Sequence, residues 1–330
     1  MELGLKIMQL IKNIQEFIFE EERPFKSCHA STLVKLDDGS ILVAWFGGSR
    51  EGADDVAIWM SRKQDGKWSY PVKVADIEGI PHWNPVLFRK KDGRIILYYK
   101  VGHKIPSWYT LSIYSDDGGI TWSEPKELVP GDVGGRGPVK NKPIVLSDGT
   151  WAAPASLEGK YWDAFVDLSY DEGETWHKSG IVPYNHDDSM PGKGIIQPTL
   201  WESAPGHVHM LLRSTAARIF RSDSTDYGKT WCPAYPTYLP NNNSGIDLDR
   251  ADDGTLVLAY NPVGMYKGPR TPLILGISED NGGTWKQGFI LEKFPGEFSY
   301  PAVVIKGKTV YVTYTWHRER IVFCELMLTP

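Results

Sequence analysis

Polar and aromatic side chains that could bind and act on a small polar ligand recur along this 330-residue chain, each group close to the end of a short apolar segment. Aromatic rings stack on flat apolar surfaces of a ligand, while amides, cations and carboxylates bind its polar groups or act on its bonds. We expect about half of these side chains to line one binding site. The groups are His82, Trp83 and Asn84; Lys100, His103 and Trp108; Arg136, Lys140 and Asn141; Asn243, Ser244 and Asp247; and Trp316, His317 and Arg318.

Metal and cofactor chemistry is not indicated by the spacing of the ligand-type residues. The histidines form no H-x-x-x-H pair, and we expect His207 and His209 on the outward face of a strand. Cys28, Cys232 and Cys324 form no C-x-x-C pair, so neither a zinc site nor a disulfide framework is predicted. We therefore expect no metal and no cofactor.

The charge of the chain favours a small-molecule or glycan partner. Its formal net charge is -5 and it has no basic block longer than residues 89–91, which argues against nucleic acid and against an anionic membrane surface. No segment approaches the roughly 20 apolar residues that cross a bilayer. Residues 1–14 lack the apolar core of a signal peptide. A cytoplasmic location is expected, or a periplasmic or secreted one if a leader has been trimmed; the oligomeric state is not predicted.

The elements that would position these side chains are indicated by an octet with the pattern S-x-D-x-G-x-T-W. Full copies occupy residues 115–122, 169–176, 224–231 and 278–285, and a degenerate copy occupies residues 61–68. The starts at 61, 115, 169, 224 and 278 are 54, 54, 55 and 54 residues apart. A constant period of this length is typical of propellers and solenoids.

Each octet has the composition of a hairpin turn and not of a reactive site. Aspartate can accept hydrogen bonds from backbone N–H groups two residues on, glycine adopts positive φ, and tryptophan can pack beneath the turn. Between the octets lie runs rich in Val, Ile, Tyr and Thr, such as residues 94–100, 255–260 and 309–314. Four such strands make one propeller blade, and 330 residues at a period near 54 make about six.

The last blade lacks one strand, because a further octet would begin near position 332, beyond the end of the chain. We expect residues 15–20 to supply that outer strand and so cover an exposed sheet edge. The sequence therefore predicts one all-β domain over residues 1–330, a six-bladed β-propeller closed by its N-terminal strand.

These octets are Asp-boxes, also called BNR repeats, and the whole chain resembles the bacterial sialidase (neuraminidase) superfamily. Residues 47–52, Gly-Gly-Ser-Arg-Glu-Gly, and residues 299–303, Ser-Tyr-Pro-Ala-Val, add to the likeness. The resemblance implies a sugar-processing site where the inner strands converge. Asp-boxes also occur in propellers without activity, so the function depends on the site residues.

The resemblance implies three arginines that hold a substrate carboxylate, since a guanidinium presents a planar fork to it. Arg213 and Arg270 match the second and the third. His29 occupies the place of the first, where it could still donate one or two hydrogen bonds.

The resemblance also implies the catalytic groups. In the glycine-flanked loop 47–55, Arg50 matches a binding arginine and Asp55 the general acid and base, with Asp54 as the nearest competitor. Tyr300 matches the nucleophile.

A neutral phenol needs a carboxylate to take its proton, but Gln197 occupies the place of the family glutamate. Glu202 is nearby in the sequence. Glu297, three residues before Tyr300, would face the opposite side of a regular strand.

Three functions fit these residues. The first is an exo-acting glycoside hydrolase for a terminal acidic sugar, with Asp55 and Tyr300 catalytic and with a set of binding residues. That set is His29, Arg50, Arg213, Arg270, Gln197, His82, Asn84 and Trp108. The second is a polysaccharide lyase acting on a uronic acid, in which His82, His103 or Tyr300 takes the proton next to the carboxylate. The third is a glycan-binding propeller without turnover.

Overall fold

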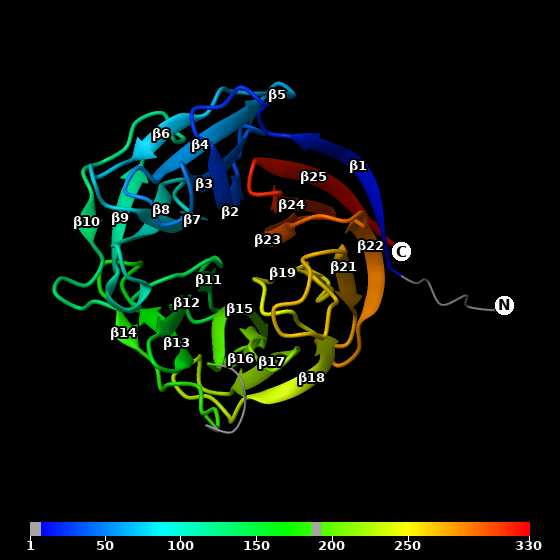
Figure 1. The fold of residues 1–330 in the computed structure, drawn as a ribbon. Helices are drawn as coiled ribbons and strands as arrows, with labels where there is room; N and C mark the ends of the chain where they lie inside the picture. Colours follow the sequence, from blue (N-terminus) through cyan, green and yellow to red (C-terminus); the bar gives the residue numbers. More distant parts are fainter. Residues whose placement is uncertain (1–7, 187–192) are drawn as a thin grey trace.

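The computed structural model describes residues 8–186 and 193–330, which form six antiparallel sheets arranged in a ring (Figure 1). We number these sheets as blades one to six. From the axis outward, blade one consists of β2 (Ser27–Lys35), β3 (Ile41–Gly48), β4 (Ala57–Gln64) and β5 (Lys67–Trp68), with β6 (Val72–Ala75) also paired to β4. Blade two consists of β7 (His82–Arg89), β8 (Ile95–Val101), β9 (Tyr109–Ser115) and β10 (Lys126–Glu127). Blade three consists of β11 (Ile144–Val145), β12 (Trp151–Glu158), β13 (Trp162–Ser169) and β14 (His177–Lys178). Blade four consists of β15 (Ile195–Ala204), β16 (His207–Ser214), β17 (Arg218–Ser224) and β18 (Tyr235–Pro240). Blade five consists of β19 (Asp247–Arg250), β20 (Leu256–Tyr260), β21 (Leu273–Ser278) and β22 (Lys286–Glu292). Blade six consists of β23 (Phe298–Lys306), β24 (Thr309–Trp316), β25 (Arg320–Thr329) and β1 (Gln9–Phe17).

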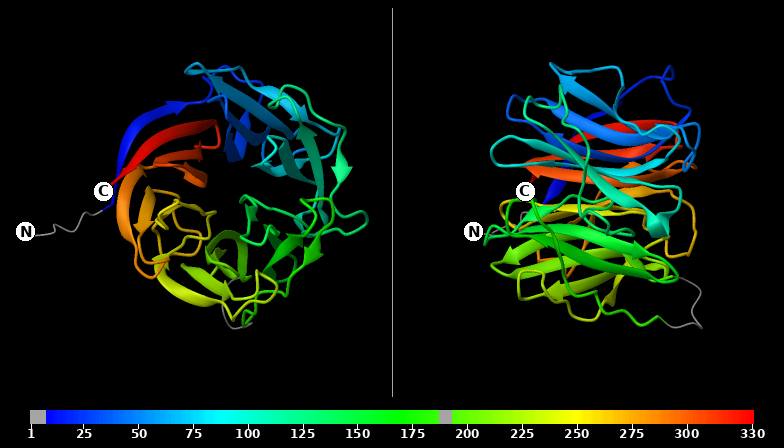
Figure 2. Two further views of the ribbon diagram at one scale, coloured as in Figure 1. Left: turned by 180° about the vertical axis from the view of Figure 1, so that it is seen from behind. Right: turned by 90° about the vertical axis from the view of Figure 1, so that its left-hand side faces the viewer.

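The predicted six-bladed propeller is confirmed, and Figure 2 shows the ring from behind and from the side. Successive apolar side chains along the central strands point to opposite faces of the sheet and pack against the two neighbouring blades. Both faces of these sheets are therefore buried. Among the described residues no helix is long or apolar enough to span a membrane. The short 3-10 helix η1 covers Ile105–Ser107.

The N-terminal strand closes the ring, as the missing strand of the last repeat predicted. β1 pairs antiparallel with β25 from Gln9 opposite Thr329 to Phe17 opposite Val322. The strand starts at Gln9 and not at position 15, and it ends before position 20. Glu16 binds Lys63 and Trp68 of blade one at 2.5 and 2.8 Å. β1 therefore ties the last blade to the first.

Deleting residues 1–22 should lower the melting temperature by on the order of 10 °C. The deletion exposes the last sheet edge and removes the buried side chains Leu10, Ile18 and Phe19, each of which stabilises the fold by about 2 kcal/mol. Differential scanning calorimetry measures the shift. Deleting residues 1–7 alone, which leaves β1 intact, is the matched control, and an unchanged melt after the longer deletion would refute the closure.

The four full octets form the turns between the third and fourth strands of blades two to five, and their aspartates are structural. Asp171 is representative: it accepts hydrogen bonds from Thr175 N at 2.9 Å and from Ser169 Oγ at 2.8 Å. Asp117, Asp226 and Asp280 make the same contacts with their own Ser and Thr residues. The aspartate thus reaches the threonine four residues on. The backbone N–H two residues on, which the sequence assigned to the aspartate, donates instead to the serine, as Gly173 N does to Ser169 Oγ at 2.7 Å.

His209, expected on an outward strand face, is buried and belongs to an inter-strand network. Its Nδ1 lies 2.5 Å from Asp223 Oδ1, and its ring stacks on Trp201 with centroids 5.0 Å apart. The prediction of an outward face was wrong because blades of a propeller bury both faces of their middle strands against neighbouring blades.

The innermost strands share one feature that positions the candidate site. In each blade, one non-glycine residue within or just before the first strand has a left-handed backbone; these are Ala30 (φ 58°), Asn84 (41°), Lys140 (66°), Gln197 (52°), Asn243 (61°) and Tyr300 (53°). In blades one, two, four and six this residue coincides with a break in the register of the first two strands. Such bulges re-aim side chains and cost on the order of 1–3 kcal/mol each.

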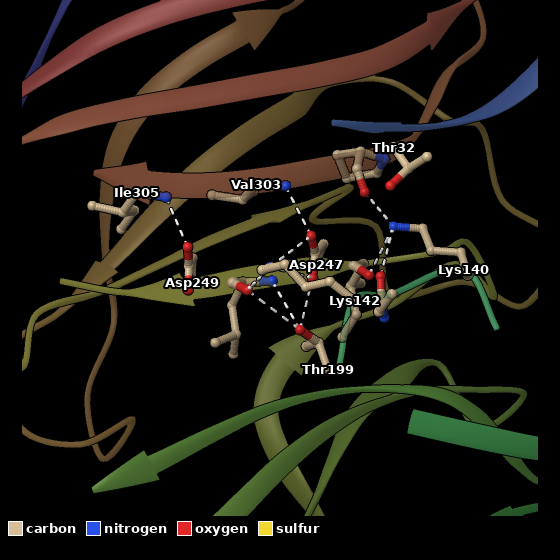
Figure 3. Close-up of polar contacts among 12 residues, drawn as sticks. Thr32, Lys140, Lys142, Thr199, Asp247, Asp249, Val303 and Ile305 are labelled. Carbon is tan, nitrogen blue, oxygen red and sulfur yellow. Dashed lines mark hydrogen bonds and ion pairs between the residues drawn. The ribbon is translucent and has the colours of Figure 1, made fainter. Parts of the chain in front are cut away.

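A buried ionic network joins the inner strands across the axis (Figure 3). Asp247 accepts hydrogen bonds from Thr199 Oγ1 and from Val303 N, both at 2.8 Å, and lies 3.2 Å from Lys142 Nζ. These contacts link blades three, four, five and six. Asp249 adds a bond from Ile305 N at 2.7 Å. The network fixes the distances between the blades that carry the candidate site.

Candidate active site

Tyr300 lies at the bulge of β23 and contacts two residues of blade four. Arg213 Nη1 donates to Tyr300 Oη at 2.7 Å and to Gln197 Oε1 at 3.0 Å. Gln197 Nε2 lies 3.4 Å from the same tyrosine oxygen. All three side chains are buried. The structure thus brings the predicted nucleophile, the second predicted arginine and the glutamine at the family glutamate position into direct contact.

Arg270, from the segment between β20 and β21, packs against the ring of Tyr300. Its guanidinium carbon lies 5.6 Å from the ring centroid, and that of Arg213 lies 5.7 Å from it. Arg270 Nη1 donates to Glu297 Oε1 and to Ser299 Oγ, both at 3.1 Å. Its side chain is 23% exposed. Arg270 can therefore reach both the tyrosine and solvent.

His29, from β2, lies directly against Tyr300. The two ring centroids are 4.1 Å apart, and His29 Nδ1 lies 2.9 Å from Thr315 Oγ1. Burial, together with the positive charges of Arg318, Arg270, Arg213 and Lys140, lowers the pKa of His29 well below its usual range. The imidazole is therefore neutral near pH 7, and its buried Nε2 has no hydrogen-bond partner within the described part of the chain.

We call the five residues that meet at Tyr300 the axial cluster: His29, Gln197, Arg213, Arg270 and Tyr300. Two further residues hold it in place. Asn243 Oδ1 accepts from Arg213 Nε at 2.9 Å. Lys140 Nζ donates to Ile246 O at 3.0 Å and to Pro301 O (Figure 3). It lies 5.9 Å from the centroid of the Tyr300 ring. Burial lowers the pKa of Lys140 to about 7.

Glu297 connects the axial cluster to Arg318. It was expected to face away from Tyr300, which lies three positions further on. β23 begins only after Glu297, and within the described residues no hydrogen bond joins its side chain to Tyr300. Glu297 Oε1 accepts from both Arg270 Nη1 at 3.1 Å and Arg318 Nε at 2.5 Å.

The loop of residues 47–55 reaches the same region, although Asp55 itself bonds within the loop. Asp55 accepts from Ser49 N at 2.9 Å and from Ser49 Oγ at 2.9 Å, and its residue is exposed. Arg50 is exposed as well. Glu51 of this loop lies 2.7 Å from Arg318 Nη1. The predicted roles of Asp55 and Arg50 stay predictions; the loop contact nearest to the axial cluster is made by Glu51.

Asp54, the competitor of Asp55, lies 3.3 Å from His103 Nε2 across the gap between blades one and two. Both side chains are more than half exposed. Asp54 is therefore paired with a residue of blade two and not with a residue that contacts Tyr300.

The predicted binding residues of blade two occupy buried positions. His82 Nδ1 bonds to Ile80 O at 2.9 Å, and its ring stacks on Tyr99. Asn84 has the left-handed backbone of this blade. Trp108 packs against Trp83 and is only 2% exposed, so little of its ring surface is open to a sugar in this structure. Their predicted contacts with substrate stay predictions.

Two residues near the axial cluster had no signal in the sequence analysis. The ring of Trp162 lies 5.5 Å from the guanidinium carbon of Arg213. Glu158 pairs with Trp162 across the β12–β13 hairpin. Burial raises the pKa of Glu158, while the charge of Arg213 opposes that shift. Residues at a hairpin tip are placed by the whole blade, so no local motif marks them.

Other polar residues that the sequence placed near the ends of inner strands form a separate buried network. Arg136 binds Asp167 through Nε and Nη2 at 3.0 and 2.8 Å, and Lys100 Nζ donates to Thr110 Oγ1 at 2.7 Å and to Arg136 O at 2.5 Å. Burial lowers the pKa of Lys100 to about 7. The polar groups of these residues are paired with one another within blades two and three, so we assign them a structural role. In the described ranges, His, Cys, Asp and Glu form no group of three that could hold a metal ion.

The arrangement suits a carboxylate ligand. Two guanidinium groups converge on one tyrosine, and the imidazole beside them carries no charge. Guanidinium groups in a poorly hydrated site bind carboxylates with charge-assisted hydrogen bonds, which are about twice as strong as neutral ones. The tyrosine hydroxyl lies at the centre of this arrangement, in contact with Arg213.

Comparison with known proteins identifies the family. A family model described as a BNR repeat-like domain matches residues 39–312. The chain belongs to this family. Two curated relatives of this BNR repeat chain are sialidases, from Micromonospora viridifaciens (28% identical over 243 residues) and from Clostridium perfringens (30% identical over 188 residues). The matches cover 66% and 45% of this chain but only 36% and 47% of the relatives' lengths.

Solved structures share the fold of the BNR repeat chain. The Hadza microbial sialidase Hz136 superposes with a TM-score of 0.79 at 18% identity, over 95% of this chain and 68% of that one. A Dyadobacter fermentans protein of unknown function superposes with a TM-score of 0.78 at 17% identity, over 97% and 100% of the two chains. At these identities the likeness is one of fold.

Proposed function

We propose that this BNR repeat protein is an exo-acting glycoside hydrolase that releases a terminal acidic sugar from a glycan. The observation that carries the proposal is the convergence of Arg213 and Arg270 on Tyr300. A carboxylate bound by the two arginines would place the adjacent anomeric carbon of a sugar acid over the tyrosine. The sialidases among the relatives of this chain support the same class of substrate.

In this mechanism each residue has one role. Arg213 and Arg270 bind the carboxylate, and Asp55 protonates the leaving oxygen after its loop releases the bonds to Ser49. Tyr300 attacks or stabilises the anomeric centre, as the tyrosine of sialidases does in place of a second carboxylate. Gln197 cannot take the phenol proton, so that proton passes to solvent water, and the N–H that Arg213 donates to Oη stabilises the phenolate charge. A water molecule then takes the place of the tyrosine at the anomeric carbon and gives its proton to Asp55.

A second reaction, β-elimination from a uronic acid, is favoured by one observation. Within the described residues no carboxylate contacts Tyr300 Oη, whereas neutral His29 lies against its ring with Nε2 unpaired. When the ring of Tyr300 moves to uncover Nε2, the neutral imidazole can take the proton next to a carboxylate that the arginines hold. The electron pair of that C–H bond forms the double bond, and the sugar–oxygen bond breaks to leave an unsaturated product.

A screen of aryl glycosides and acidic oligosaccharides tests the proposal. Hydrolysis gives a free acidic sugar with no gain in near-ultraviolet absorbance, and we expect Asp55→Ala to lower its rate by about 10²-fold or more. A product that absorbs in the near ultraviolet would instead establish elimination. Equal glycan binding by wild type and Asp55→Ala, with no released sugar from either, would identify a binding propeller and refute both reactions.

A further inference from the structure

We propose that Arg318 is the third guanidinium of the carboxylate site, and that it supplies from blade six the charge that is missing at His29 of blade one. The inference rests on the proposed function and names a specificity-determining residue for it. Arg318 lies in the turn between β24 and β25, far in sequence from His29.

The backbone places Arg318 beside the position it would replace. His317 and Arg318 both have left-handed backbones, with φ of 51° and 60°. Arg318 O accepts from Cys28 N at 2.8 Å, and His317 N donates to Glu297 O at 2.8 Å. The turn is therefore fixed on one side to the residue before His29 and on the other to the segment that precedes Tyr300.

The guanidinium of Arg318 binds two glutamates that a ligand carboxylate could replace. Its Nε donates to Glu297 Oε1 at 2.5 Å and its Nη1 donates to Glu51 Oε2 at 2.7 Å. Arg318 is 26% exposed, Glu297 38% and Glu51 45%. Ion pairs this exposed contribute about 0–1 kcal/mol, so an incoming carboxylate can displace Glu51 at little cost.

Arg270 and Arg318 already hold one carboxylate between them. Both donate to Glu297 Oε1, so the two guanidinium groups lie at a separation that accommodates an anionic oxygen. Glu51 binds Nη1 of Arg318 and is the more exposed of its two acidic partners, so a substrate carboxylate that approaches from solvent would meet this contact first. In the resting protein, Glu51 thus takes the place of the ligand.

The charge balance explains why a histidine is tolerated at position 29. The pKa of His29 is lowered by four positively charged side chains, those of Arg318, Arg270, Arg213 and Lys140. An arginine at position 29 would add another buried positive charge to this group, at a desolvation cost that only further anions could offset. With Arg318 present, the neutral imidazole of His29 still leaves the site with three guanidinium groups, those of Arg213, Arg270 and Arg318.

Isothermal titration calorimetry with N-acetylneuraminic acid, with glucuronic acid and with neutral glucose tests the inference. For whichever acid the wild type binds, Arg318→Gln should weaken binding by about 10- to 100-fold, the worth of a hydrogen bond to a charged group. Binding of the neutral sugar should stay unchanged. Glu51→Gln should strengthen binding of the acid by a few-fold, because it removes the competing carboxylate.

The opposite signs separate ligand binding from a structural role. If Arg318 only fastens the loop through Glu51, both variants will weaken binding, and the inference is overturned. Arg320→Gln, which alters a neighbouring arginine packed on Phe17 and Trp316, is the matched control. If the wild type binds neither acid, the proposed function fails together with this inference; if Arg213→Ala abolishes binding while Arg318→Gln does not change it, only the inference fails.

Discussion

Replacing Tyr300 by phenylalanine should lower kcat/KM on an acidic substrate by about 10²-fold or more, with little change in stability. The hydroxyl is the atom that Arg213 contacts at 2.7 Å and the group proposed to act at the anomeric centre. The phenyl ring keeps the tilted contact with the His29 ring and the packing of both arginines. The loss should therefore appear in kcat more than in KM.

Steady-state kinetics and a thermal melt of the Tyr300→Phe protein measure this effect. Tyr311→Phe is the matched control: it removes a hydroxyl from the same blade, on β24, at a buried ring that lies against Phe323. The control should retain the wild-type rate. A Tyr300→Phe protein that is folded and as active as wild type would remove the tyrosine from the mechanism.

Replacing Arg213 by alanine should cost about 2–4 kcal/mol of transition-state stabilisation, or roughly 30- to 10³-fold in kcat/KM. The side chain is 7% exposed and binds Tyr300, Gln197 and Asn243. Its loss removes a fork for the substrate carboxylate and also leaves the tyrosine oxygen without its charged donor.

Two variants distinguish the fork from general destabilisation. Arg213→Lys keeps the charge without the bidentate geometry and should give an intermediate rate. Arg221→Ala, one strand further out in blade four, removes an arginine bound to Asp223 and Asn281 and should lower stability without lowering kcat/KM. Full activity of Arg213→Ala on charged substrates would exclude the proposed carboxylate site.

The architecture could be predicted from the sequence because the same turn, formed by residues close together in the sequence, recurs from blade to blade. The Ser, Asp and Thr side chains of an octet satisfy one turn within eight residues, so the signal is local and recurs at a constant period. The closing strand followed from the count of strands. Its register did not, because pairing of β1 with β25 depends on side chains more than 300 residues away.

The candidate site was predictable only in part. Arg213, Arg270 and Tyr300 follow from the resemblance, and the structure brings them together. The contact of Glu297 with Arg270 and Arg318 was missed because the three residues come from separate loops, before β21, before β23 and after β24. Proline after Asn84, Gln197 and Tyr300 was the available signal, since it marks three of the six left-handed positions. Arg318 had no signal as a partner of Arg270.

A crystal structure of the protein soaked with the acidic sugar that it binds most tightly is the most direct test. We expect the sugar carboxylate to lie within hydrogen-bond distance of Arg213 and Arg270, with the anomeric carbon facing Tyr300. A sugar bound elsewhere would contradict this account. One such place is the pocket of about 250 Å³ lined by Lys35, Arg89 and Lys306. A carboxylate turned away from both arginines would contradict it equally.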